Sequence, residues 1–107
     1  MALQVAVVSL EMIAALRPLV SRIRRNDRSL ADQLVRAASS VALNIAEAEY
    51  SDPGNKRARF FTAAGSANES LAALRVANAW GYFSLDDAQA AEVLLRRIRA
   101  MLWKLTR

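Results

Sequence analysis

Apolar residues recur every three or four positions along almost the whole chain, which is the spacing of one face of an α-helix. Short breaks separate four such stretches, and we expect helices over residues 3–24, 29–50, 56–80 and 84–105. Connections this short join antiparallel neighbours. The pattern therefore predicts an all-α fold, an up-down-up-down antiparallel four-helix bundle in a single domain over residues 1–107.

The breaks between these stretches carry helix boundary signals. Ser29 is the expected N-cap of the second helix, and the run Ser51–Asn55 (Ser-Asp-Pro-Gly-Asn) is a strong turn sequence. Gly81 suits the left-handed position that follows a helix, because glycine has no Cβ to clash there. Ser84 is the expected N-cap of the fourth helix, with two aspartates in its first turn.

The first helix is unusually apolar, since residues 2–16 are interrupted only by Gln4, Ser9 and Glu11. This run is shorter than the roughly 20 residues that span a bilayer, so we expect a buried or interface helix and no membrane partner. A helix that is apolar nearly all round needs more than one packing partner, which predicts a homo-oligomer. Pro18 lies inside the helix and should kink it.

The second and third helices each carry a second, polar line beside the apolar one. If the connecting turn centres near Pro53, facing residues have numbers that add to about 106. This register pairs opposite charges at both ends and small hydrogen-bonding residues between them. We call this set the polar seam: Glu47 with Arg59, Asn44 with Thr62, Ser40 with Ser66, and Arg36 with Glu69. The seam is interpreted as structural, and the alternative is a ligand or active site within it.

The composition excludes most catalytic chemistry. The chain has no His and no Cys, so neither a histidine base nor a thiolate nucleophile is present. Its three glycines are too far apart for a phosphate-binding loop. We therefore expect no enzyme activity, no catalytic residue, no cofactor and no metal. We expect no signal peptide, because no basic segment follows Met1, and a cytoplasmic location is expected.

The net charge of +5 is unevenly distributed. Residues 17–28 hold five arginines against one aspartate, and residues 96–107 hold five basic residues and no acid. Basic clusters rich in arginine suit phosphate recognition, and the alternative is a solubilising face. The candidate nucleic-acid or partner-binding residues are Arg22, Arg24, Arg25, Arg28, Arg96, Arg97, Arg99, Trp103, Lys104 and Arg107.

Trp103 falls opposite the apolar line of the fourth helix, with Arg99 and Arg107 one turn before and after it. An exposed tryptophan among arginines suits either a protein interface or stacking on a nucleic-acid base. A protein interface is favoured, because tryptophan is common among the residues that dominate binding energy.

Two blocks of the sequence resemble a known family, that of the four-helix-bundle proteins encoded in 23S rRNA intervening sequences. Its relatives include accessory variability proteins of diversity-generating retroelements. The matching residues are Asp32-Gln33, Arg36-Ala37-Ala38, Ser40, Asn44-Ile45-Ala46-Glu47, and Phe60-Phe61 through Ala64-Gly65-Ser66 to Glu69. The chain departs from the family at the exit of the second helix, with Ala48 in place of glycine and Glu49-Tyr50-Ser51 in place of a nearby arginine.

The resemblance implies a bacterial protein that assembles into a homopentamer. We predict a non-enzymatic, basic oligomeric scaffold that binds RNA or DNA or a nucleic-acid enzyme. The retroelement branch of the family implies a more specific version, an accessory protein of a reverse transcriptase and its template RNA. The alternative is a structural protein with no direct nucleic-acid activity.

Overall fold

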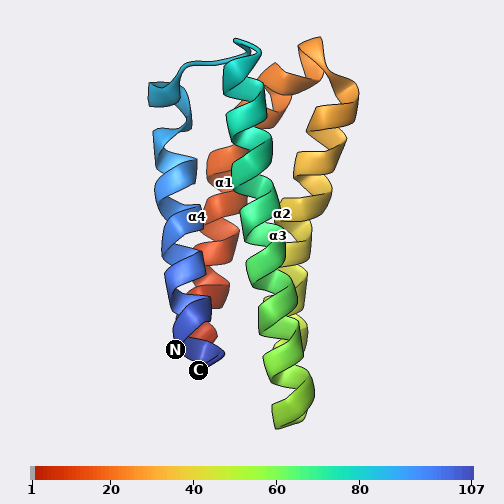
Figure 1. The fold of residues 1–107 in the computed structure, drawn as a ribbon, viewed down its shortest axis with the longest axis vertical. Helices are drawn as coiled ribbons and strands as arrows, with labels where there is room; N and C mark the ends of the chain where they lie inside the picture. The colour runs from red at the N-terminus through yellow and green to blue at the C-terminus, as the bar shows by residue number, and fades with distance from the viewer. Residues whose placement is uncertain (1) are drawn as a thin grey trace.

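The computed structural model describes residues 2–107, with side chains from Gln4 onward, and these residues form four helices. They are α1 (Ala2–Asn26), α2 (Arg28–Ala48), α3 (Pro53–Ala79) and α4 (Leu85–Leu105). The helices run alternately up and down, and each packs against two neighbours to make a bundle of 42 × 23 × 19 Å (Figure 1). The α1–α2 and α3–α4 connections lie at one end, and the two chain ends lie near the other.

Two helices begin earlier than the sequence pattern predicts. The N-cap of α2 is Asp27, whose Oδ1 accepts a hydrogen bond of 3.0 Å from the backbone N–H of Leu30, so Ser29 is wrong as the cap. The N-cap of α3 is Asp52, and Pro53 occupies the first helical turn, where its missing N–H costs nothing. Hydrogen bonds from the backbone and side chain of Asn55 lower the pKa of Asp52.

The α3–α4 connection follows its sequence signals closely. Gly81 has a φ of +81°, and the N–H groups of Gly81 and Tyr82 bond back to the carbonyls of Asn78 and Ala77, which is a Schellman motif. Ser84 and Asp87 then form a capping box that starts α4. The backbone N–H of Ser84 and the guanidinium of Arg22 lower the pKa of the Asp87 carboxyl.

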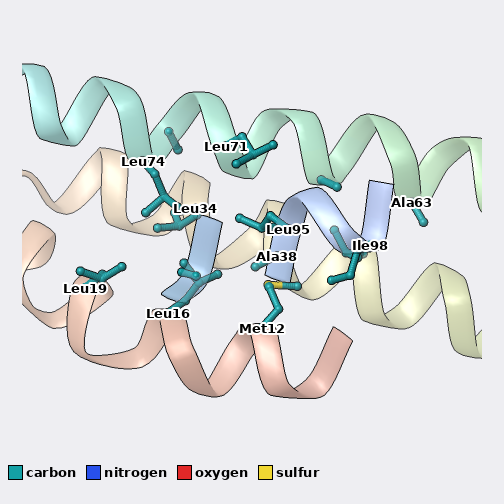
Figure 2. Packing of buried hydrophobic residues seen from close by; sticks show 14 of the residues in the cluster. Met12, Leu16, Leu19, Leu34, Ala38, Ala63, Leu71, Leu74, Leu95 and Ile98 are labelled. Carbon is teal, nitrogen blue, oxygen red and sulfur yellow. The ribbon is translucent and has the colours of Figure 1, made fainter. Parts of the chain in front are cut away.

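Side chains from all four helices fill one continuous core (Figure 2). Its largest fully buried members include Met12 of α1, Leu34 of α2, Leu74 of α3 and Ile98 of α4. Many of the remaining core positions are alanines, which allow the helix backbones to approach closely. Ala48 is one of them and is fully buried at the end of α2, where the chain turns through the exposed Tyr50.

The inward face of α1 is buried, but its outer face carries exposed apolar side chains. Val7 is 53% exposed and Leu10 is 65% exposed. The stretch Gln4–Asn26 is long and apolar enough to cross a membrane by length and hydropathy, so the length argument made from the sequence is wrong. Buried core helices can have the same length and hydropathy. The inner face of α1 is apolar because it packs against α2 and α4. The outer face lacks a partner within the described chain.

Candidate functional site

The polar seam forms in the predicted register near the α2–α3 turn. The Arg59 guanidinium makes an ion pair with the Glu47 carboxylate, and the Ser66 hydroxyl donates to the Ser40 hydroxyl oxygen at 2.9 Å. Because the two contacts lie about two turns apart on both helices, they confirm the register between α2 and α3.

The other two predicted pairs do not form. The Asn44 amide donates to the carbonyl and hydroxyl oxygens of Ser40, at 2.9 and 3.0 Å, while the Thr62 hydroxyl donates to its own helix. Arg36 and Glu69 are both exposed and make no ion pair in the described part of the chain. The predicted pairing of Arg36 with Glu69 is therefore wrong.

Arg36 and Glu69 do not meet because the residues next to them in the sequence occupy the contacting faces of the two helices. Ala37 on α2 and Ser70 on α3 are buried, so they lie on the contacting faces, and Arg36 and Glu69 are each rotated about 100° away. The Ser70 hydroxyl donates to the carbonyl of Ser66 at 2.9 Å. No buried side-chain nitrogen or oxygen among the described residues lacks a partner. The seam thus has the features of a structural contact.

This geometry predicts a small effect of removing Arg36. We expect Arg36→Ala to change the free energy of unfolding by at most about 1 kcal/mol, because exposed charges contribute little. A buried ion pair would instead cost about 3–5 kcal/mol to break. Urea denaturation of Arg36→Ala, Glu69→Ala and the double variant would measure both the loss and the coupling. A coupling above about 1 kcal/mol would contradict the exposed geometry.

The first basic cluster is partly neutralised at the upper end of the bundle in Figure 1. Arg22 pairs with Asp87 at 2.9 Å, and Arg24 pairs with Asp32 at 2.7 Å. Arg25 and Arg28 are exposed and have no ion-pair partner within residues 2–107. Two of the four predicted arginines are therefore available to an outside anion without breaking an ion pair.

The second basic cluster is divided between two faces of α4. Arg97 and Lys104 line a shallow groove beside α1, together with Gln4. Arg96 and Arg99 line a different groove, beside α3, and Trp103 lies in that groove as well. The sequence prediction treated these residues as one cluster, but the packing of α4 between two helices separates them.

The groove between α3 and α4 contains two exposed aromatic side chains, Phe61 and Trp103, and encloses about 410 Å³. Phe61 is 53% exposed and Trp103 is 61% exposed. The Arg107 guanidinium carbon lies 3.2 Å from the centroid of the Trp103 ring, and that of Arg57 lies 5.3 Å from the centroid of Phe61. Both are cation–π contacts at the surface.

Phe61 was not identified as a site residue from the sequence. Its signal was available, because it follows Phe60, and adjacent helical residues point about 100° apart. Once Phe60 enters the core, Phe61 must lie toward the outside. Only the packing of α3 on α4 places it beside Trp103.

A second, apolar groove of about 350 Å³ lies between α1 and α2. Its apolar lining includes Ile13 and Val20 of α1 and Val35 of α2, with the Arg17 side chain at its edge. This groove was not predicted. It extends the unpartnered apolar surface of the outer face of α1.

The described residues contain no group of three or more carboxylates that could hold a metal ion. With no His or Cys in the sequence, the features that distinguish this surface are arginines and exposed aromatic rings.

Residues 2–104 match the model of the 23S rRNA-intervening sequence protein family. The chain belongs to that family. A solved structure of a protein of unknown function from the S23 ribosomal protein family of Bacteroides thetaiotaomicron has the same fold, with a TM-score of 0.89. The two chains are 20% identical, and the similarity covers 96% of this chain and 98% of the other. No curated protein matches the chain.

Family membership confirms the resemblance found in the sequence, and the solved structure confirms the all-α four-helix bundle. The family is one of unknown function, and no catalytic evidence accompanies it.

Proposed function

We propose that this chain is a non-enzymatic, basic homo-oligomeric scaffold that binds nucleic acid in the bacterial cytoplasm. The observation that carries the proposal is the set of arginines on the bundle surface without carboxylate partners, including Arg25, Arg28, Arg97 and Arg99. Arginine presents a planar array of donors that matches phosphate oxygens. A phosphate backbone offers such oxygens at regular intervals, so several weak contacts can add together.

Assembly into an oligomer supports the same proposal. The exposed Val7 and Leu10 and the apolar groove between α1 and α2 give one side of the bundle an apolar surface that a second copy can cover. Each added copy repeats the arginines around the symmetry axis, which raises the affinity for a long polyanion. The family resemblance favours a pentamer.

The finer form of the proposal is an accessory role beside a reverse transcriptase and its template RNA. It rests on the resemblance to the retroelement branch of the family, and exposed Trp103 offers an anchor for a protein partner. The second candidate is a structural bundle with no direct nucleic-acid activity. The pairing of Arg22 and Arg24 with carboxylates favours that alternative, since it leaves the first cluster weaker than its sequence indicates.

Binding to structured RNA at several salt concentrations tests the proposal. We expect the affinity to fall steeply with salt, because bound arginines release counterions from the phosphates. A variant with Arg25, Arg28, Arg97 and Lys104 changed to Glu should bind more weakly and with a shallower salt dependence, and it should keep the helical circular dichroism spectrum. Arg36→Gln is the control, because Arg36 is exposed and lies outside the predicted binding residues, and it should bind as the native chain does. If the native oligomer has no affinity for RNA or DNA even at low salt, direct nucleic-acid binding is wrong and the structural alternative stands.

A further inference from the structure

We infer that the groove between α3 and α4 is a binding site for single-stranded nucleic acid, in which bases stack on Trp103 and Phe61 while the flanking arginines hold the phosphates. This inference rests on the proposed function, because it requires that the chain bind nucleic acid, and it adds to the arginines outside the groove a site for one class of ligand.

The groove is distinguished first by its two aromatic rings. Phe61 and Trp103 come from different helices, and each is more than half exposed although both are strongly apolar. They line the same groove, with Ala64 and Ala100 as its small apolar floor. The groove therefore presents two exposed aromatic rings that a planar apolar ligand can cover. Nucleic-acid bases are such ligands, and proteins stack them on exposed aromatic side chains.

The groove also carries a positive charge. Arg96 and Arg99 line the groove, Arg57 and Arg107 lie at its end beside the aromatic rings, and Arg75 continues the arginine line along α3. Glu92 lies 4.0 Å from Arg96, and the exposed Glu69 follows Asn68 on α3. The remaining arginines of the set form no ion pair in the described part of the chain. The groove is thus strongly positive, as a path for phosphates requires.

Polar contacts within the groove hold several of its side chains in place. The Arg99 guanidinium donates to Oδ1 of Asn68 at 3.0 Å, which orients the amide and leaves its N–H groups to donate to a base edge. Arg57 donates to the Thr106 carbonyl at 2.9 Å, which holds its guanidinium beside Phe61. Arg107 covers one face of the Trp103 ring, so a base that stacks on that face displaces its guanidinium, which can then pair with a phosphate.

The aromatic rings of the groove distinguish single strands from other ligands. The bases of a duplex are stacked on each other and their faces cannot reach Trp103 or Phe61, whereas unpaired bases can. An acidic peptide would satisfy the arginines and leave the two aromatic faces unused. Two exposed aromatic rings flanked by arginines therefore favour a single strand as the ligand.

The experiment compares two tryptophans of similar exposure. Trp103 is in the groove, and Trp80, which is 69% exposed, caps the end of α3 near the opposite end of the bundle. Binding of a short oligouridine and of double-stranded RNA of the same length is measured by fluorescence anisotropy for the native chain, Trp103→Ala, Phe61→Ala and Trp80→Ala. We expect the two groove variants to bind oligouridine about 5- to 100-fold more weakly, while Trp80→Ala binds as the native chain does.

Two further variants test whether Trp103 contacts the bases. In Trp80→Phe, where Trp103 is the remaining tryptophan, oligouridine should quench the fluorescence, and Trp103→Phe should retain part of the affinity.

Equal binding by Trp103→Ala and Trp80→Ala, with salt-sensitive RNA binding intact, would overturn the groove assignment and leave the proposed function standing. The absence of any nucleic-acid binding by the native chain would overturn both. A change in oligomer mass in Trp103→Ala would assign the groove to an interface between copies and overturn the inference.

Discussion

Leu10→Asp is expected to dissociate the proposed oligomer into monomers of 11.8 kDa while leaving the bundle folded. Leu10 is 65% exposed in the isolated chain, so an aspartate there meets water when the chain is alone. In an interface formed by the outer face of α1, the same carboxylate would be buried without a partner, which is strongly unfavourable. Light scattering at micromolar concentration would measure the change in mass.

The matched control is Leu85→Asp, since Leu85 is 62% exposed at the first turn of α4. An acidic residue there lies near the positive end of the helix dipole and should leave both fold and assembly unchanged. A stable monomer of the native chain would contradict the proposal of an oligomer. In that event, vesicle flotation would test whether the apolar surface of α1 binds a lipid membrane instead.

Phe60→Ala is expected to lower the free energy of unfolding by about 3–5 kcal/mol, because the cavity left in a close-packed core cannot fully collapse. Phe60 is 2% exposed and is the largest of the fully buried side chains. The loss is a large fraction of the stability of a domain of this size. Guanidinium denaturation followed by circular dichroism would measure it.

The neighbouring Phe61→Ala is the matched control for Phe60→Ala. It removes the same side chain from a position that is 53% exposed, and we expect a change in stability of no more than about 1 kcal/mol. If the groove binds single strands, Phe61→Ala reduces binding without reducing stability. Equal losses of stability in the two variants would contradict the placement of Phe60 in the core and Phe61 on the surface.

The sequence by itself determined the four helices and much of how they connect. The periodicity of apolar residues is a local property, and so are the Gly81 and Ser84 signals, which the structure reproduces with a left-handed glycine and a capping box. The register between α2 and α3 could also be predicted, because a short turn near Pro53 leaves little freedom in how the two helices align. The contacts of Ser40 with Ser66 and of Glu47 with Arg59 follow from it.

The helix starts were less well predicted, because two polar residues close together in the sequence can compete to cap the same helix. Asp27 caps α2 in place of Ser29, and α3 begins at Pro53. A sequence pattern ranks such candidates by residue type, whereas the backbone geometry of the connection selects one of them.

Only the tertiary structure decided which side chains lie on the contacting faces. The helical period shows which residues share a face, but the rotation of each helix against its neighbours decides which face is covered. That rotation buries Ser70 and leaves Glu69 exposed, and it separates Arg97 and Lys104 from the rest of the second basic cluster. The same rotation brings Phe61 of α3 beside Trp103 of α4. It is fixed by the packing of the apolar faces of α3 and α4 along their whole length, and the positions of the two surface rings follow from it.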